Sequence, residues 1–177
     1  MVKYTSSEIV FEEIPNEVTL AFNLSNCQNH CEGCHSTFLR GNVGDELTSD
    51  VIDEKINDKF GITCICFMGE GNDPEALQAL ILHVKENHKN LKIALYSGRE
   101  DVPEDFYWNN LDYLKIGPYK ANFGPLNKTT TNQRLYVFKK GLRGTLMLNG
   151  KSHPYWTDDT YLFWTPEDYK KYRAEKL

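Results

Sequence analysis

Three cysteines lie within a stretch of eight residues in a polar part of the sequence. Cys27, Cys31 and Cys34 are four and three residues apart, and their neighbours are glutamine, asparagine, histidine and glutamate rather than apolar residues. Thiolates are soft ligands, and three that converge on one point select an iron–sulfur cluster, zinc or copper(I) over magnesium or calcium. A loop that binds a metal or a cluster is therefore the first prediction.

Several kinds of metal site compete for this loop. His30 or His35 could complete a Cys₃His zinc site, but structural zinc sites usually pair two short knuckles and no second knuckle follows. A ferredoxin-type cluster lacks its fourth cysteine unless Cys64 or Cys66 reaches it. Three ligands leave one iron of a [4Fe–4S] cluster open, as a substrate-binding metal requires. The cluster is the preferred interpretation, and zinc is the alternative.

The segments that must position this loop alternate between predicted strands and helices. The expected strands are Val18–Leu24, Ile62–Met68, Leu91–Tyr96 and Leu111–Ile116, and the expected helices run from Thr48 or Ser49 to about Phe60, from Asp73-Pro74 to about Asn87–Asn90, and within Val102–Asn110. This order predicts parallel strands joined by right-handed crossovers. The cysteines follow the first strand, at the kind of strand end where α/β folds place ligand sites.

The last third of the sequence breaks this alternation. After a long polar loop, short strands are expected over Leu135–Phe138 and Thr145–Leu148, with a hairpin turn at Asn149-Gly150 and a closing helix over Glu167–Glu175. The fold class indicated by these patterns is α/β with a β-rich C-terminal tail.

The motif C-x-x-x-C-x-x-C in a loop after the first strand of such a chain resembles the radical S-adenosylmethionine enzymes. This resemblance implies a [4Fe–4S] cluster on Cys27, Cys31 and Cys34, with S-adenosylmethionine as the second cofactor. It also implies the fold of that family, a partial (βα) barrel of mostly parallel strands. No catalytic residue is expected beyond the cluster ligands.

Further segments resemble the activating proteins of anaerobic ribonucleotide reductase. Gly33 between the last two cysteines and His35 after the third match the pattern of those proteins, and so do the later blocks Leu111–Tyr119 and Thr130–Leu135. The resemblance covers roughly Val18–Tyr136. It implies that His35 lies beside the adenine or the cluster, although an ordinary loop histidine is the alternative.

Two strand ends supply further candidates for binding S-adenosylmethionine. Gly69, Glu70 and Gly71 stand where the family has a Gly-Gly-Glu or Gly-Gly-Asp segment, whose backbone holds the amino group of the methionine moiety. Here the two glycines are not adjacent, and a simple glycine turn is the alternative. Ser97 ends the third strand and could bind the carboxylate or the ribose, with a structural turn as its alternative role.

The function implied by the resemblance is activation of a glycyl-radical enzyme. The chain would reductively cleave S-adenosylmethionine to a 5′-deoxyadenosyl radical and generate a glycyl radical on the large chain of anaerobic ribonucleoside-triphosphate reductase. A flavodoxin- or ferredoxin-like protein would donate the electron. The alternatives are a small radical enzyme that acts on a small molecule, and a non-catalytic zinc or iron–sulfur interaction module.

Composition bounds these possibilities. The 177 residues, 40% of them hydrophobic, suit one domain over 1–177. Its core is expected at about 18–136 and a C-terminal extension at about 137–177. The aromatic residues of this extension could dock a partner or cover the sheet. A net charge of −5 without a basic run argues against nucleic acid and anionic membranes as partners. Because no signal peptide or membrane span is evident, a cytoplasmic protein is expected.

The remaining cysteines and the helical histidines receive ordinary roles. Cys64 and Cys66 alternate within an apolar strand, so they face the same side and are expected to be small core residues. His83 and His88 lie on a predicted surface helix and need no special role.

Overall fold

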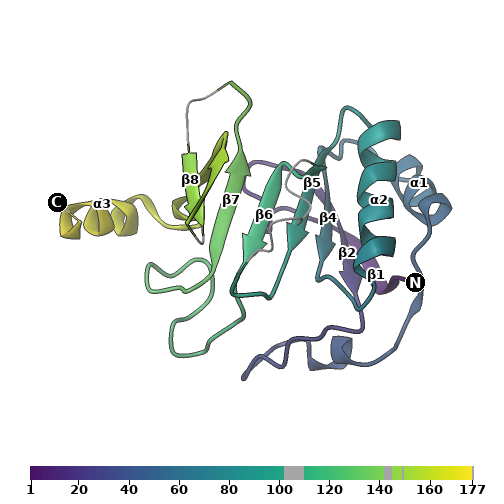
Figure 1. Cartoon of the computed structure of the whole chain (residues 1–177), viewed down its shortest axis with the longest axis horizontal. Coiled ribbons are helices and arrows are strands. Elements are labelled where there is room, and N and C mark those ends of the chain that lie inside the picture. Colours follow the sequence, from purple (N-terminus) through teal and green to yellow (C-terminus); the bar gives the residue numbers. More distant parts are fainter. Residues whose placement is uncertain (102–109, 142–144, 149, 177) are drawn as a thin grey trace.

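An eight-stranded mixed sheet organises the computed structural model, which describes residues 1–101, 110–141, 145–148 and 150–176 (Figure 1). The strand order is β10-β7-β6-β5-β4-β2-β1-β3. These strands are β1 (Lys3–Val10), β2 (Thr19–Leu24), β3 (Asp45–Glu46), β4 (Cys64–Met68), β5 (Lys92–Tyr96), β6 (Tyr113–Ile116), β7 (Arg134–Phe138) and β10 (Trp156–Asp158). A separate hairpin pairs β8 (Thr145–Leu148) with β9 (Lys151–Pro154). The helices are α1 (Ser49–Asn57), α2 (Pro74–Asn87) and α3 (Pro166–Glu175), with 3₁₀ turns η1 (Thr37–Arg40) and η3 (Thr160–Phe163).

The predicted partial (βα) barrel of mostly parallel strands is wrong. Four of the seven neighbouring strand pairs are antiparallel, and only β2, β4, β5 and β6 run parallel to one another. Strand β1 was not predicted, because its largely polar residues do not form an apolar run. It pairs antiparallel with β2. On the other side β7 and β10 extend the sheet antiparallel from β6. The parallel centre is therefore continued by antiparallel strands in both directions.

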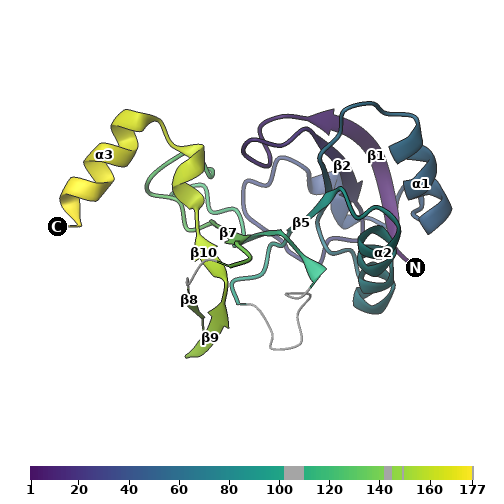
Figure 2. The same cartoon turned by 90° about the horizontal axis from the view of Figure 1, so that it is seen from above.

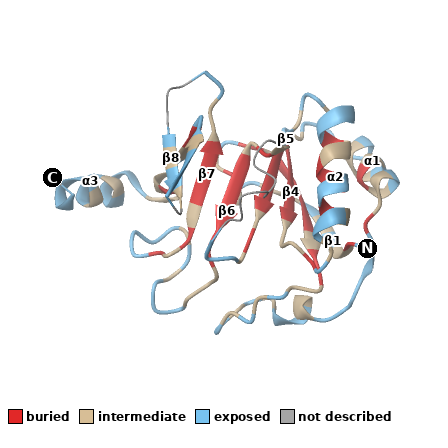
Figure 3. Ribbon diagram, viewed as in Figure 1, coloured by how far each residue is buried: buried red, intermediate tan, exposed pale blue. Residues whose placement is uncertain are grey.

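The two faces of the parallel centre bury different kinds of side chain. One face carries large residues such as Phe22 and Phe67, which pack with the apolar sides of α1 and α2. The other face carries small residues, among them Ala21, Cys66 and Ala94, against which the chain between β1 and β2 packs. Figure 3 shows the resulting buried band along the central strands. Cys64 and Cys66, which lie two residues apart in β4, are fully buried core residues, as expected.

Helix α1 begins where the sequence predicts. The hydroxyl of Thr48 accepts a hydrogen bond from the Val51 amide, which satisfies one of the free N–H groups of the first turn. The helix ends at Asn57, however, three residues before the predicted end at about Phe60, and Phe60 is fully exposed.

Helix α2 also follows its sequence signals. The Asp73 carboxylate accepts a hydrogen bond from the Ala76 amide, and Pro74 occupies the first turn, where its missing N–H costs nothing. One side of the helix is buried, with Leu77, Leu80, Ile81 and Val84 at helical spacing.

The C-terminal part lies beyond β7 and contributes one strand, β10, to the main sheet. Helix α3 is capped by Thr165, has no buried residue, and projects away from the sheet (Figure 2). The predicted helix within Val102–Asn110 lies almost entirely outside the described residues, and so does Asn149 of the predicted hairpin turn. Among the described residues, no helix is both long enough and apolar enough to cross a bilayer.

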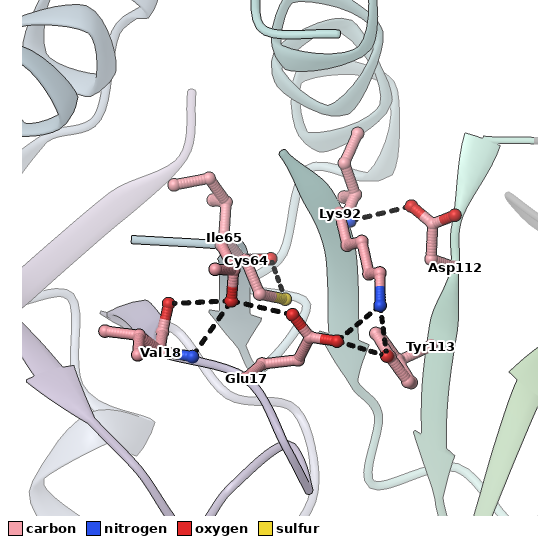
Figure 4. Close-up of polar contacts among 9 residues, drawn as sticks. Glu17, Val18, Cys64, Ile65, Lys92, Asp112 and Tyr113 are labelled. Atoms are coloured by element: carbon pink, nitrogen blue, oxygen red, sulfur yellow. Dashed lines mark hydrogen bonds and ion pairs between the residues drawn. The ribbon is translucent and has the colours of Figure 1, made fainter. Parts of the chain in front are cut away.

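A polar network closes the sheet where the parallel strands begin, which we call the amino edge (Figure 4). Glu17, only 7% exposed, precedes β2 and accepts hydrogen bonds from Lys92 Nζ at 2.5 Å and Tyr113 Oη at 2.7 Å. Its second oxygen accepts one from Thr63 Oγ1 at 2.7 Å, and that hydroxyl in turn accepts from the Val18 amide. Burial alone would raise the pKa of Glu17, but these hydrogen bonds hold it below its ordinary value.

Candidate functional site

The predicted site residues come together where the parallel strands end, which we call the carboxyl edge. The cysteine loop follows β2, Gly69 follows β4, Ser97 follows β5 and Gly117 follows β6, so all four loops leave the same side of the sheet. In Figure 1 these loops occupy the lower border of the molecule. Although the barrel is absent, the local parallel arrangement gathers the motifs at one place.

The cysteine loop is held by hydrogen bonds to the segment that follows it. Asn26 has a positive φ of 60°, and the next amide, of Cys27, donates to the Leu39 carbonyl at 2.9 Å. The Arg40 guanidinium donates to the Cys31 carbonyl at 2.8 Å, while its Nε is buried without a hydrogen-bond partner among the described residues. All three loop cysteines are half-buried free thiols. The segment after the loop therefore places the partly buried Arg40 guanidinium, with one N–H that has no partner among the described residues, beside the Cys31 backbone.

The three thiols do not form a ready mononuclear site. Within the described part of the chain, no set of three ligand atoms that includes Cys27, Cys31 or Cys34 lies within 4.8 Å of one another. His30 is exposed, and its Nδ1 lies 3.2 Å from the Gln28 carbonyl oxygen. The described residues therefore hold no preformed three-cysteine site, and the group that this loop binds stays a prediction.

A cavity of about 850 Å³ opens beside the loop. Of the predicted cofactor residues, His35, Gly69 and Ser97 line it together with Cys34, one of the three predicted cluster ligands. The predicted residues that do not line it are Gly33, Glu70, Gly71 and the other two predicted ligands, Cys27 and Cys31. Gly33 lies instead against Tyr119, whose ring centroid is 5.5 Å from that of His35.

The floor of the cavity is one row of side chains across the parallel strands. Asn23, Met68, Tyr96 and Lys115 are successive cross-strand partners in β2, β4, β5 and β6, and all four line the cavity. They share the sheet face that carries the small core residues, because side chains two apart in a strand point the same way. That face leaves the room in which the cavity forms.

Lys115 is the functional candidate that the sequence analysis missed. It is 8% exposed, and its Nζ donates to the Gly117 carbonyl at 3.0 Å and lies 5.5 Å from the centroid of the Tyr96 ring. Among the described residues no carboxylate forms an ion pair with it. Burial lowers the pKa of Lys115 to about 8, against the opposing influence of the Cys31 and Cys66 thiols. A lysine inside the apolar run of β6 was the signal that could have identified it.

Glu70 and Ser97 form a second polar group at the carboxyl edge. The Ser97 hydroxyl donates to the Glu70 carboxylate and accepts from the Arg99 amide at 3.1 Å. The Arg99 guanidinium Nε lies 2.8 Å from Glu70 Oε2 and 3.1 Å from Oε1. Glu70 is thus already paired with a cation, unlike Lys115, which has no carboxylate partner in the described chain.

Gly98 fixes the cysteine loop against β5 by close approach. A Cβ atom at this position would overlap the side-chain amide of Asn29, which lies between the first two cysteines. Its backbone does not have the positive φ that favours glycine, so the requirement is for space alone. The glycine therefore lets the loop pack against the end of β5.

The two later sequence blocks lie side by side. Ile116 pairs with Arg134 in the antiparallel β6–β7 ladder, and Gln133 Nε2 donates to the Gly117 carbonyl at 3.2 Å. Gly117 has a φ of +107°, and a Cβ there would lie only 3.0 Å from the Gln133 Cα. These blocks supply Lys115, Tyr119 and Gln133 to the cavity.

Comparison of the chain with protein-family models, with curated proteins and with solved structures gives no match. The resemblance to the radical S-adenosylmethionine enzymes therefore depends on the motifs of this sequence and on the site that they form.

Proposed function

We propose that this chain is a radical S-adenosylmethionine activating enzyme that generates a glycyl radical on an anaerobic ribonucleoside-triphosphate reductase. The observation that supports this most directly is the cavity at the carboxyl edge, which the Cys34 thiol and the buried Lys115 ammonium both line. A ligand for iron and a cation that lacks a carboxylate partner among the described residues thus face one space. S-adenosylmethionine carries a carboxylate that would pair with Lys115, and its ammonium and sulfonium charges would suit Glu12 and Glu13, which also line the cavity.

The residues present fit an iron–sulfur cluster as well. Cys27, Cys31 and Cys34 would hold it, and the partly buried guanidinium of Arg40, which binds the Cys31 carbonyl, would offset the negative charge of the thiolates. When bound, the cluster and S-adenosylmethionine supply one-electron cleavage of the sulfonium to a 5′-deoxyadenosyl radical.

The other residues would bind and orient the substrate. Lys115 would hold the methionine carboxylate, while Ser97, whose hydroxyl already donates to Glu70, would support the same cavity wall. Met68 and Tyr96, in the floor, would exclude water from the reacting atoms. His35 and Tyr119 provide aromatic surface for the adenine near Cys34.

The proposed partners are the large chain of the reductase and a flavodoxin- or ferredoxin-like electron donor. Leu162 lines the cavity and is 38% exposed. Tyr155 and Met147, which precede it in the same C-terminal part, are also exposed. These apolar residues would contact the loop of the large chain that carries the glycine.

We further infer a cytoplasmic location. All five cysteines are free, and thiols that must ligate iron persist where the compartment is reducing.

The test begins with anaerobic purification and analysis of iron, sulfide and zinc. The proposal expects a brown protein with about four irons and four sulfides per chain. Cys27→Ala, Cys31→Ala and Cys34→Ala should each lose the cluster and deoxyadenosine formation, whereas the matched control Cys64→Ala should keep both because Cys64 lies in the core. Zinc without acid-labile sulfide would instead support the zinc-module alternative.

The partner is tested by electron paramagnetic resonance on a mixture with the reductase. A glycyl radical that needs reductant, S-adenosylmethionine and this chain together is the expected result. Deoxyadenosine release that is unchanged by the reductase and never accompanied by a glycyl radical would point to a small-molecule substrate.

A further inference from the structure

A second cluster of ligating side chains lies between the two helices that cover the sheet. Asp53 lies in α1 and His83 in α2, and His88 caps the C-terminal end of α2. The two helices lie side by side on the face away from the cavity (Figures 1 and 2). The sequence analysis gave these histidines no special role, because Asp53 is thirty residues away in the sequence.

The three side chains converge on one point. His83 Nε2 lies 2.9 Å and His88 Nε2 lies 2.7 Å from the same oxygen, Asp53 Oδ1. One ligand atom from each residue lies within 4.8 Å of the others, and in the described part of the chain no other trio of ligating side chains meets this limit.

The spacing needs little change to admit an ion. Ligands at about 2.05 Å from a tetrahedral zinc ion lie about 3.3 Å apart, so the histidine–carboxylate distances must widen by roughly half an ångström. Rotation of exposed side-chain bonds can supply this, since the side chains of His83, His88 and Asp53 are 25%, 18% and 36% exposed.

The surroundings also suit a metal-ligating histidine. Asn87 lies one turn after His83, and its side-chain amide is 3.2 Å from His83 Nδ1. Metal-bound histidines usually have their second nitrogen held by a polar group, which fixes the ring. The same amide nitrogen donates to the His83 carbonyl oxygen at 2.9 Å, which anchors Asn87 beside the ring. Ligation through Nε2 would place the imidazole proton on Nδ1 and would move the Asn87 amide off that nitrogen.

We propose that Asp53, His83 and His88 bind a Zn²⁺ ion that fastens α1 to the end of α2. Two imidazoles and one carboxylate are the donor set that zinc accepts, and partial exposure leaves its fourth position to water. The site lies on the helical face and the cysteine cavity on the opposite one, so its role is structural and independent of the proposed activity. The ion would stabilise the folded state, since the unfolded chain does not hold these three ligands together.

Cobalt titration of the full chain separates this site from the cysteines. Co²⁺ held by nitrogen and oxygen gives weak visible bands, whereas Co²⁺ on thiolates adds strong sulfur-to-metal absorption in the near ultraviolet. We expect one Co²⁺ per chain that gives the weak bands alone and that Zn²⁺ displaces. In His83→Gln and in His88→Gln the affinity of this site should fall by at least about 100-fold. The control Asp50→Asn, on the same helix as Asp53, should bind as the wild type does.

Thermal unfolding gives the second measurement. Zn²⁺ at about 100 times its Kd should raise the Tm of the metal-free protein by about 5 to 10 °C, and should not do so in Asp53→Asn. The proposal is overturned if the histidine variants retain the thiol-free Co²⁺ bands at wild-type affinity, or if every bound Co²⁺ shows sulfur absorption. Neither result alters the iron and sulfide analysis, so the two proposals fail separately.

Discussion

Each edge of the parallel strands has a lysine, and the two lysines differ in whether a carboxylate is paired with them. At the amino edge, Lys92 meets the buried carboxylate of Glu17, and the hydrogen bond between them raises the pKa of Lys92. At the carboxyl edge, Lys115 is more deeply buried, has only a carbonyl oxygen as hydrogen-bond acceptor, and has its pKa lowered by burial. The first lysine is part of a paired network, whereas the second has no carboxylate partner among the described residues.

This difference separates stability from function. A buried polar group that is fully paired supports the fold, and one that lacks its partner costs stability unless a ligand supplies the missing charge. Substitutions at the two edges should therefore change the free energy of unfolding in opposite directions.

The largest effect is expected from Glu17→Ala. It leaves the buried Tyr113 hydroxyl without its acceptor and the half-exposed Lys92 without its ion-pair partner, so the free energy of unfolding at pH 7 should fall by about 3 kcal/mol in urea denaturation. Because the folded-state pKa of Glu17 is lowered, its contribution is present above pH 4.5 and is lost as the pH falls through the folded value. The exposed control Glu54→Gln should change stability by less than about 1 kcal/mol. Equal effects of the two would contradict the role of the network.

Lys115→Met should instead stabilise the protein. The pKa of about 8, against 10.5 for a free lysine, means that charging Lys115 in the folded state costs up to about 3 kcal/mol at pH 7. This cost disappears as the pH rises from 8 to 10.5, so the stabilisation of the variant relative to the wild type should shrink over that range. The difference in the free energy of unfolding between the variant and the wild type is measured by urea denaturation at pH 7, below that range, and at pH 10.5, its upper limit.

The same substitution should weaken binding of S-adenosylmethionine by at least about tenfold, measured by equilibrium dialysis on the reconstituted protein. A variant that is less stable than the wild type at pH 7, or that binds equally well, would remove the contrast between the two edges.

Gly98→Ala tests how the cysteine loop is attached to the carboxyl edge. The added methyl group overlaps the Asn29 side chain, so we expect a loss of about 1 to 2 kcal/mol and a reduced iron content after reconstitution. In the control Gly41→Ala the new Cβ meets its nearest atoms at 3.5 Å, an ordinary contact, and the φ of −77° suits alanine. That variant should keep its iron.

The smallest effect is expected from Arg99→Gln. Its ion pair with Glu70 has a guanidinium that is about half exposed, so thermal unfolding should register a change of less than about 1 kcal/mol. A loss as large as that of Glu17→Ala would show that the carboxyl edge is held by its own ion pair as strongly as the amino edge.

The sequence by itself determined the local features. It predicted the cysteine loop, the four parallel strands, the caps at Thr48 and Asp73, and the core positions of Cys64 and Cys66, because each depends on neighbours within a few residues. The roles of the cluster ligands stay a prediction, since no comparison or contact tests them.

Only the tertiary structure decided how these pieces are combined. The antiparallel extension through β1 and β7 replaced the expected barrel, since strand pairing joins segments whose own patterns do not state their partners. Packing between distant segments also leaves Lys115 without a carboxylate partner among the described residues and brings Asp53 next to two histidines. Whether a buried charge is paired depends on which distant side chain faces it, and that is settled only when the chain packs.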